Sequence, residues 1–417
     1  MSKFFSKFCV ENIMLIFFMC FPVLRALVFS KISGGPYFMI AMLVMMIVYV
    51  FFKHDHRKHG YFDIIILYLV IFFLFLIKFV YDESVDVWLE RDYGVSYALL
   101  MGGVFAYAVI RLQKNVESMI FGLKVAAFIL AIYYAYMSLE PIQVGYWTYT
   151  QFGHIRHSPS HMSWSYGVLL VISIFAIYVV DENKIFMIVP IIIGFIGILL
   201  YGSRGTIMSF IIGLLVVVLF YEKKKITGKK AFWLTVIVSL ALFFTSSTGL
   251  ELLQNILDEY NLRSRFITSV INAMGGETFE NESTGRLRIW THALDMINEQ
   301  PFGYGVFGQR NSIYNLGIKW GYAHEFFLDI LLEFGVVFGM VLIILFIRMI
   351  LKFFSKVTNS HERIVFIVFL TVSCELLVSG SFWIHYGIWS LMALYVNHFK
   401  NNWQVTPEDK TLKKTEA

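Results

Sequence analysis

Long apolar runs, repeated along almost the whole chain, most strongly constrain what this sequence can fold into. Many of them approach the ~20 residues that a helix needs to cross about 30 Å of hydrocarbon. Charged residues make up only 15% of the 417 residues, which is too few to cover the surface of a soluble protein of this length. The sequence therefore predicts an all-α, polytopic transmembrane helix bundle.

We expect about twelve membrane-spanning helices. Several runs are short, so the helices must include flanking residues. The first run lacks a small-residue cleavage site, which indicates a retained first span and not a signal peptide. The runs cover residues 13–29, 37–52, 61–77, 95–110, 116–137, 164–180, 185–201, 206–221, 231–245, 326–347, 364–378 and 383–397.

Basic residues in the short loops predict the orientation of the chain. With the N-terminus in the cytoplasm, the inner short loops carry 15 Lys and Arg and the outer ones carry 4. The inner loops are 53–60, 111–115, 181–184, 222–230 and 348–363, and the outer loops are 30–36, 81–93, 138–165, 202–206 and 379–385. Cytoplasmic loops show this excess of positive charge. An even number of spans then places both termini in the cytoplasm and residues 248–323 outside.

This polar segment, 76 residues long, is the part of the chain in which we expect catalytic or binding residues. It follows an N-terminal bundle of about nine spans, residues 1–247, and precedes about three C-terminal spans, residues 324–399. We expect it to form a large extracytoplasmic loop with short amphipathic helices. Residues 400–417 are polar and predict a disordered cytoplasmic tail.

Arg204 stands in a Gly-Ser-Arg-Gly turn between two apolar runs on the predicted outer side. An arginine at this depth needs water, a carboxylate or a phosphate as its partner. Gly202 and Gly205 permit a tight turn and the close approach of the backbone to a ligand. The turn therefore predicts either a phosphate-binding arginine or an arginine that snorkels to the surface.

Arg286 and Arg288 open a predicted helix in the polar segment. Ser283 or Thr284 can cap this helix, and Pro301 ends it. Helix N-termini and arginine side chains both favour phosphate oxygens. The alternative is an ordinary helix at the membrane surface whose arginines contact lipid headgroups. The apolar residues at helical spacing are Leu287, Trp290, Leu294 and Ile297.

His324 and the acidic residues after it mark the entry into the next apolar run. A neutral imidazole there could take a proton from a hydroxyl, although a lone histidine is more often a structural donor. Glu325, Asp329 and Glu333 follow one another at intervals of four residues, so they share one helix face. Acidic groups at this depth must face a polar cavity or the protein interior.

Three further features are weaker candidates. The G-x-G-x-x-G pattern of residues 303–308 follows a helix and not a strand, so a turn explains it better than a dinucleotide site. The histidines within residues 154–161 could bind a metal ion, but no carboxylate lies close by, and Arg156 among them is a more plausible anion contact. Glu375 is either the partner of an arginine or an acid that lines a cavity.

In their order along the chain, these motifs resemble those of the O-antigen polymerases (Wzy type) and O-antigen ligases, a superfamily of polytopic membrane glycosyltransferases. The resemblance covers about residues 185–350 well, whereas the N-terminal half matches only in topology. Each motif is weak alone, but the ordered set is specific. The matching residues are Ser203, Arg204 and Gly205; Gly285, Arg286 and Trp290; the helix, proline and glycine stretch 293–308; and the stretch 323–339, which ends in Gly335 and Gly339.

The resemblance implies a reaction at the outer, periplasmic face of a bacterial inner membrane. The donor would be an oligosaccharide on undecaprenyl diphosphate. A sugar hydroxyl would attack its anomeric carbon while the lipid diphosphate leaves. The implied reaction needs no cofactor and no metal ion, and its partners are membrane lipid and a flippase and chain-length regulator of the same pathway, with no nucleic acid.

The resemblance also implies roles for the candidate residues. Arg204 and Arg286 would hold the diphosphate and stabilise its developing charge. His324 would orient or deprotonate the acceptor hydroxyl. The sequence departs from the family at Glu325, where asparagine often follows the histidine, so Glu325 would be either the orienting partner of His324 or the acid itself. Secondary diphosphate contacts would be Arg288 and Arg156.

Polymerases and ligases of this kind differ in their acceptor, which is another lipid-linked repeat unit or lipid A–core. The sequence favours a polymerase, because an aromatic-rich and individual N-terminal half suits an enzyme that reads diverse repeat units. A flippase or transporter of the same sugars is the alternative from another class. It predicts functional charges within several spans and pseudo-symmetric halves, whereas the charges here gather at the outer face and in one loop.

Overall fold

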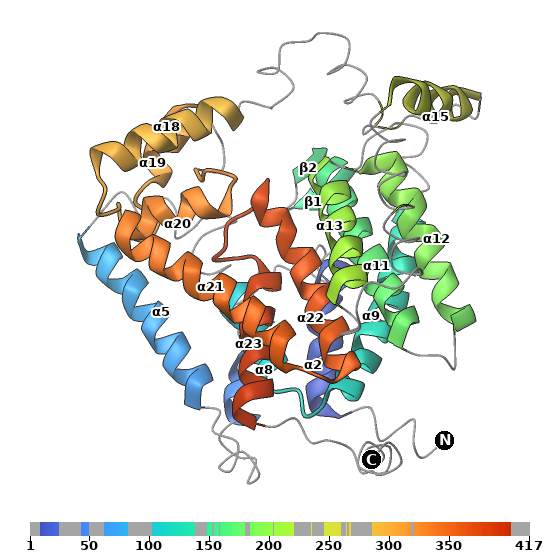
Figure 1. The fold of residues 1–417 in the computed structure, drawn as a ribbon, viewed down its shortest axis with the longest axis horizontal. Helices are drawn as coiled ribbons and strands as arrows, with labels where there is room; N and C mark the ends of the chain where they lie inside the picture. Colours follow the sequence, from blue (N-terminus) through green and yellow to red (C-terminus); the bar gives the residue numbers. More distant parts are fainter. Residues whose placement is uncertain are drawn as a thin grey trace.

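The protein is a helix bundle in the part of the chain that its structure, a computed structural model, describes. The described residues are 9–24, 43–49, 62–81, 102–137, 148–151, 154–157, 159–179, 184–202, 204–220, 246–259, 286–317 and 321–401, with residues 235, 264 and 267. In Figure 1 the helices of the bundle stand between two ends, with α18, α19 and α20 at the upper left and α15 at the upper right. We call these the upper and lower ends.

The helices of the bundle come from both halves of the sequence. They are α2 (Val10–Met19), α3 (Phe21–Leu24), α5 (Phe62–Tyr81), α8 (Gly103–Arg111), α9 (Val116–Met137), α11 (Pro159–Val179), α12 (Lys184–Tyr201), α13 (Arg204–Phe220), α21 (Val336–Lys356), α22 (Ser360–Ser373), the 3-10 helix η5 (Cys374–Leu377) and α23 (Tyr386–Asn401). The polar segment forms α15 (Ser247–Glu259), α18 (Arg286–Glu299) and α19 (Arg310–Asn315), and α20 (Phe326–Phe334) follows it.

Three of these helices, α5, α9 and α21, are long and apolar enough to cross a membrane, and shorter apolar helices accompany them. This confirms the expectation of a membrane-embedded helical protein. The number of twelve spans, the cytoplasmic position of the termini and the division at residues 247, 323 and 399 stay predictions. Of the span expected at 231–245, all but residue 235 lies outside the described residues.

Glycines allow α11, α12, α13 and α22 to pack closely. A Cβ at Gly197 of α12 would lie 2.1 Å from the ring of Tyr166 on α11, and a Cβ at Gly213 of α13 would lie 2.3 Å from the hydroxyl of Thr371 on α22. Because no side chain fits at these positions, each pair of helices is held at one distance and register. This packing fixes the positions of α12 and α13, and Arg204 is the first residue of α13.

A two-stranded hairpin departs from the all-α expectation. Strands β1 (Thr148–Gln151) and β2 (His154–His157) pair antiparallel, with Tyr149 opposite Arg156. Threonine, tyrosine and isoleucine favour extended backbone, and we interpreted their stretch only as a loop. The hairpin lies at the upper end of the bundle (Figure 1).

The single span expected over residues 326–347 is wrong, because the helix breaks at Gly335. Gly335 has a φ of 77°, which ends α20 and lets α21 begin at the next residue in a new direction. Of α20 and α21, only α21 has the length of a membrane span. Helix α20, which carries Asp329 and Glu333, is therefore a separate element.

The turn after α18 explains this break. Gly303 and Gly305 both have positive φ, and the amides of Tyr304 and Val336 bond to the carbonyls of Leu332 and Pro301 at 2.7 and 2.8 Å. A Cβ at Gly335 would lie 2.5 Å from the backbone of the turn. The interpretation of the G-x-G-x-x-G pattern as turn glycines is thus confirmed, and the turn is fastened to the break by backbone hydrogen bonds.

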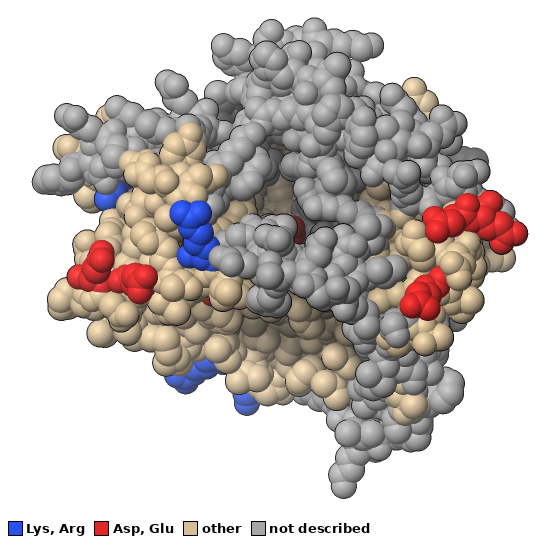
Figure 2. Space-filling model, turned by 90° about the horizontal axis from the view of Figure 1, so that it is seen from above, with Lys and Arg blue, Asp and Glu red and all other residues tan. Residues whose placement is uncertain are grey.

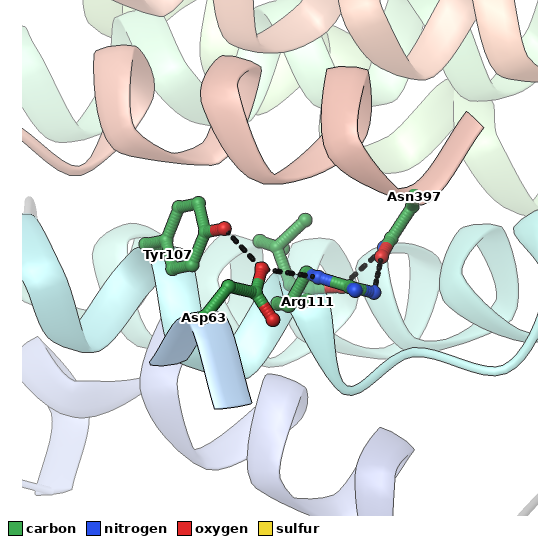
Figure 3. Close-up of polar contacts among 5 residues, drawn as sticks. Asp63, Tyr107, Arg111 and Asn397 are labelled. Atoms are coloured by element: carbon green, nitrogen blue, oxygen red, sulfur yellow. Dashed lines mark hydrogen bonds and ion pairs between the residues drawn. The ribbon is translucent and has the colours of Figure 1, made fainter. Parts of the chain in front are cut away.

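Buried polar residues also join three helices at the lower end (Figure 3). Asp63 of α5 accepts from the hydroxyl of Tyr107 and from Nε of Arg111, both on α8, at 2.6 and 2.8 Å. Nη1 of Arg111 donates to Asn397 of α23 at 2.6 Å, and Asn397 donates to the carbonyl of Ile110. Arg111 has no exposed surface. We call these four side chains the Arg111 network.

Candidate functional site

The residues from Gly321 to Glu325 form a rigid approach to α20. Gly321 and His324 both have left-handed backbone, with φ of 63° and 57°. Between them, the amide of Ala323 donates to Oδ1 of Asp329 at 2.9 Å, and its carbonyl accepts from Nε1 of Trp290 at 3.1 Å. A left-handed histidine is costly unless its surroundings hold it. These two bonds fix Ala323, the residue directly before His324.

The environment of His324 keeps its imidazole neutral. Its ring lies 4.4 Å from the ring of Tyr322. Burial, and then the positive charge of Arg286, lower the pKa of His324 to about 4. Within the described part of the chain, Nδ1 has no hydrogen-bond partner although it is buried. The imidazole is thus available as a proton acceptor at neutral pH.

Arg286 is the first residue of α18, as the sequence predicted for the helix start. The helix ends at Glu299, before Pro301. Its buried face consists of Ile289, Ala293, Met296 and Ile297, whereas Leu287 and Leu294 are exposed. The buried face packs against α20, and that Leu287 and Leu294 belong to an apolar face lying on the membrane surface stays a prediction. The predicted caps, Ser283 and Thr284, lie outside the described residues.

The half-buried side chain of Arg286 acts on several groups at the upper end. Its charge influences the imidazole of His324, the phenol of Tyr322 and the carboxyl of Glu375. Arg288, two residues later, is exposed and leaves the helix on the other side. The structure thus brings Arg286 and His324 together and leaves Arg288 apart from them.

Glu325 is the N-cap of α20. Its Oε2 accepts from the amide of Leu328 at 2.8 Å, and its backbone is extended and not helical. Burial raises its pKa, and hydrogen bonds from backbone amides oppose this effect. Glu325 therefore does not share a helix face with Asp329 and Glu333, as the spacing had indicated. That it orients His324 or serves as the acid stays a prediction.

Beneath His324 lies a group of buried charges that we call the Arg310 cluster: Arg310, Asp329 and Glu333. Arg310 has no exposed surface and stacks over the ring of Phe307, with 3.6 Å from Cζ to the ring centre. The charges of Glu333 and Asp329 act on it, although burial lowers its pKa to about 10. Asp329 and Glu333 do face the protein interior, as expected from their depth.

Glu333 connects α20 to two other segments. Its Oε1 accepts from Nε2 of Gln309 at 2.9 Å, and its Oε2 accepts from Nε1 of Trp383 at 2.6 Å. Gln309 precedes α19, and Trp383 lies between η5 and α23. The cluster therefore holds the polar segment and the connection between η5 and α23 against the helix that follows His324.

Helix η5 links this region to the helix of Arg204. It packs against both α13 and α20. It carries Glu375, whose Oε2 lies 3.7 Å from Nε2 of the buried His385. Arg204 is the first residue of α13, and its side chain lies outside what the structure describes. The backbone of Arg204 thus lies at the upper end of the bundle, the end that also carries Arg286 and His324.

The remaining candidates lie on the hairpin or near it. Arg156 is on β2, and the side chains of residues 154–161 lie outside the described residues. Within the described residues, no group of three His, Cys, Asp or Glu could hold a metal ion.

Seen from above, an acidic side chain is visible deep near the centre of the upper face, whereas others lie at its margins (Figure 2).

Sequence reasoning overlooked Tyr322 and left Arg310 and His385 without a role. A tyrosine two residues before His324 carries no motif, and only its packing on the imidazole reveals it. Nothing in the sequence distinguishes the buried Arg310 from the exposed Arg288. The charge of Arg286 acts on Glu375, and whether Glu375 is the partner of an arginine or an acid that lines a cavity stays a prediction.

Comparison with known proteins identifies one family. The family model described as O-antigen ligase (Wzy_C) matches residues 189–344. This stretch begins in α12 and ends in α21, so it contains Arg204, Arg286 and His324. The match confirms the resemblance to the O-antigen ligase and polymerase superfamily. No curated protein matches the chain.

Proposed function

We propose that the protein is a polysaccharide polymerase that joins oligosaccharide repeat units carried on undecaprenyl diphosphate. The observation that carries this proposal is a buried, neutral His324, whose pKa is lowered by burial and by the charge of Arg286, at one end of a membrane-embedded bundle. An arginine that binds a diphosphate and an imidazole that accepts a proton are what glycosyl transfer from a lipid diphosphate requires. The family match over residues 189–344 supports the same class of reaction.

In the proposed reaction, an oxygen of the acceptor hydroxyl forms a bond to the anomeric carbon of the donor. The bond from that carbon to the diphosphate breaks, and its electron pair leaves with the diphosphate. The proton of the hydroxyl passes to His324. Arg286 and Arg204 stabilise the charge that develops on the leaving group. This is preorganised electrostatic stabilisation of the transition state.

The charge of Arg286 couples binding of the donor diphosphate to the basicity of His324. A histidine with a pKa of about 4 is a weak base. Arg286 is the second cause of this low pKa, and a bound diphosphate would offset its charge. Donor binding would then raise the pKa of His324 and strengthen it as a base when the acceptor can react.

The proposed location follows from the charge of the loops. The excess of Lys and Arg in the inner short loops favours a position of the upper end at the periplasmic face of a bacterial inner membrane. We propose a flippase and a chain-length regulator of the same pathway as partners, with Arg288 and Arg156 as secondary contacts of the diphosphate.

An O-antigen ligase, which transfers the finished glycan to lipid A–core, is the second candidate. The description of the matching family as O-antigen ligase favours it. The two candidates share the donor and the leaving group, so the same arginines and histidine would serve both. They differ in the acceptor alone.

Single substitutions Arg204→Ala, Arg286→Ala and His324→Ala test both candidates. Membrane insertion is checked first, and surface polysaccharide is then resolved on a gel. A polymerase predicts loss of the long-chain ladder while one repeat unit remains attached to the core. Loss of every attached unit indicates a ligase, and an unchanged ladder in all three variants contradicts the site.

A further inference from the structure

We propose that Tyr322 is a further substrate-contacting residue, whose phenol donates a hydrogen bond to a diphosphate oxygen held at Arg286. The proposal rests on the proposed function and adds a residue that neither the motifs nor the family match assign.

The chain presents Tyr322 in one fixed position. It lies between the two left-handed residues, Gly321 and His324, and is followed by Ala323, whose amide and carbonyl are both bonded. Its side chain is 5% exposed, and its ring packs on the imidazole at 4.4 Å. The phenol is therefore as firmly placed as the histidine itself.

Four charged residues act on this phenol. Asp329 and Arg310 belong to the Arg310 cluster, and the other two residues are Glu375 of η5 and Arg286 of α18. Tyr322 is thus close enough to both the buried charges and Arg286 for their charges to act on its phenol. We propose that a diphosphate oxygen held by Arg286 comes within reach of this phenol.

The phenol can serve only as a hydrogen-bond donor or acceptor and not as a base. Burial raises its pKa further above its ordinary value, so it keeps its proton at neutral pH. A buried tyrosine normally donates its hydroxyl to a partner. Within the described part of the chain, the hydroxyl of Tyr322 makes no hydrogen bond. An anionic ligand oxygen would supply the acceptor.

The role of Tyr322 leaves the atoms of the reaction unchanged. The acceptor proton goes to His324, and the diphosphate leaves with the electron pair of the broken carbon–oxygen bond. The phenol keeps its proton and shares it with a diphosphate oxygen whose charge rises as the bond breaks. Such a bond strengthens in the transition state, which is the condition for raising the rate.

Tyr322→Phe in the full-length protein tests this inference, because it removes the hydroxyl and keeps the ring on His324. We expect the rate of glycan extension in membranes to fall by about 10- to 100-fold, as for a lost hydrogen bond to a charged group. Insertion and thermal stability should stay unchanged. The thermal stabilisation of the purified protein by undecaprenyl diphosphate should become smaller.

Tyr304→Phe is the matched control. The hydroxyl of Tyr304 already donates to the carbonyl of Met296 at 3.1 Å, within the polar segment. Its removal should leave both the rate and the stabilisation by undecaprenyl diphosphate at the wild-type level.

Arg286→Ala, measured in the same assays, distinguishes a failure of the role of Tyr322 from a failure of the proposed function. If Tyr322→Phe matches the wild type in rate and in stabilisation while Arg286→Ala is impaired, the role of Tyr322 is refuted and the proposed function stands. If Arg286→Ala also matches the wild type in both, the proposed function fails with it.

Discussion

The two ends of the bundle both contain a fully buried arginine, and the contrast between them indicates where the protein works. In the Arg111 network, each bond joins regular helices, and Arg111 contacts a carboxylate and an amide oxygen (Figure 3). In the Arg310 cluster, the surrounding segments contain left-handed residues and a broken helix. Within the described residues, buried atoms without a hydrogen-bond partner occur at both ends, Oδ1 of Asp63 at the lower end and Oδ2 of Asp329 and Nδ1 of His324 at the upper end, so the difference lies in the backbone.

The contrast has a physical meaning. Buried polar groups that are bonded within regular structure hold helices in register, whereas strained backbone gathers at active sites and ligand sites. Helix α5 runs between the two regions. Asp63 at one end belongs to the Arg111 network, and Lys78, about 22 Å further along the helix, donates to the carbonyl of Tyr304 at 3.0 Å. We therefore infer that the lower end braces the fold and that the upper end carries the reaction.

The largest effect on activity should come from Arg286→Ala. Removing a charge that stabilises a leaving group costs about 10²- to 10³-fold in rate. Its stability should change little, because the side chain is half-buried and starts a helix at the surface. Polymer length on a gel and the rate in membranes measure the effect. Arg288→Ala on the same helix is the matched variant and should cost far less. Equal losses in the two variants would contradict the separation of these arginines.

The largest effect on stability should come from Asp63→Asn at the lower end. Removing one partner of a buried ion pair leaves the other charge unpaired, which costs about 3 kcal/mol. Thermal inactivation in detergent measures this loss. Activity per folded molecule should stay within about twofold of the wild type. Asp63→Asn combined with Arg111→Met removes both charges and should recover part of the stability. A strong loss of activity without loss of stability would contradict the bracing role.

A smaller effect is expected from Asp329→Asn. Asparagine can still accept from the amide of Ala323, but it removes the negative charge beside Arg310. We expect the maximal rate to fall about tenfold, as for one charge-assisted hydrogen bond, with little change in KM, because the position of His324 and not donor binding is altered. Asp295→Asn on the exposed side of α18 is the control. A change in KM alone would exclude this positioning role.

The sequence alone predicted what depends on local pattern. Apolar runs predicted a helical membrane protein, and Pro301 and the polar segment predicted helix α18 with Arg286 in its first turn. The sequence did not predict the break at Gly335, because it depends on the turn more than 30 residues earlier, whose Pro301 carbonyl accepts from the amide of Val336. The burial of Arg310 and the packing of Tyr322 on His324 likewise arise from contacts between distant segments. Of the two arginines proposed to bind the diphosphate, only Arg286 has a side chain whose surroundings the structure describes.

The smallest effect should be the response of the wild type to mild acid. The pKa of His324 is lowered to about 4, below its ordinary value of 6.5, so the imidazole stays neutral from pH 8 down to about pH 5. In the unfolded chain it takes up a proton below about pH 6.5, so stability should decline as the pH falls from there towards 4. We expect less than a twofold change in rate between pH 8 and pH 6 from this group.

A pH–rate profile, compared with that of Arg286→Ala, checks this expectation. The profile is recorded at low donor concentration, so that it reports the free protein. Without the charge of Arg286, the pKa of His324 should rise, and the residual activity of the variant should begin to fall at a higher pH than that of the wild type. A wild-type inflection near pH 6.5 would mean that His324 is solvated and free of Arg286, and the distinction between the two ends of the bundle would then lose its chemical basis.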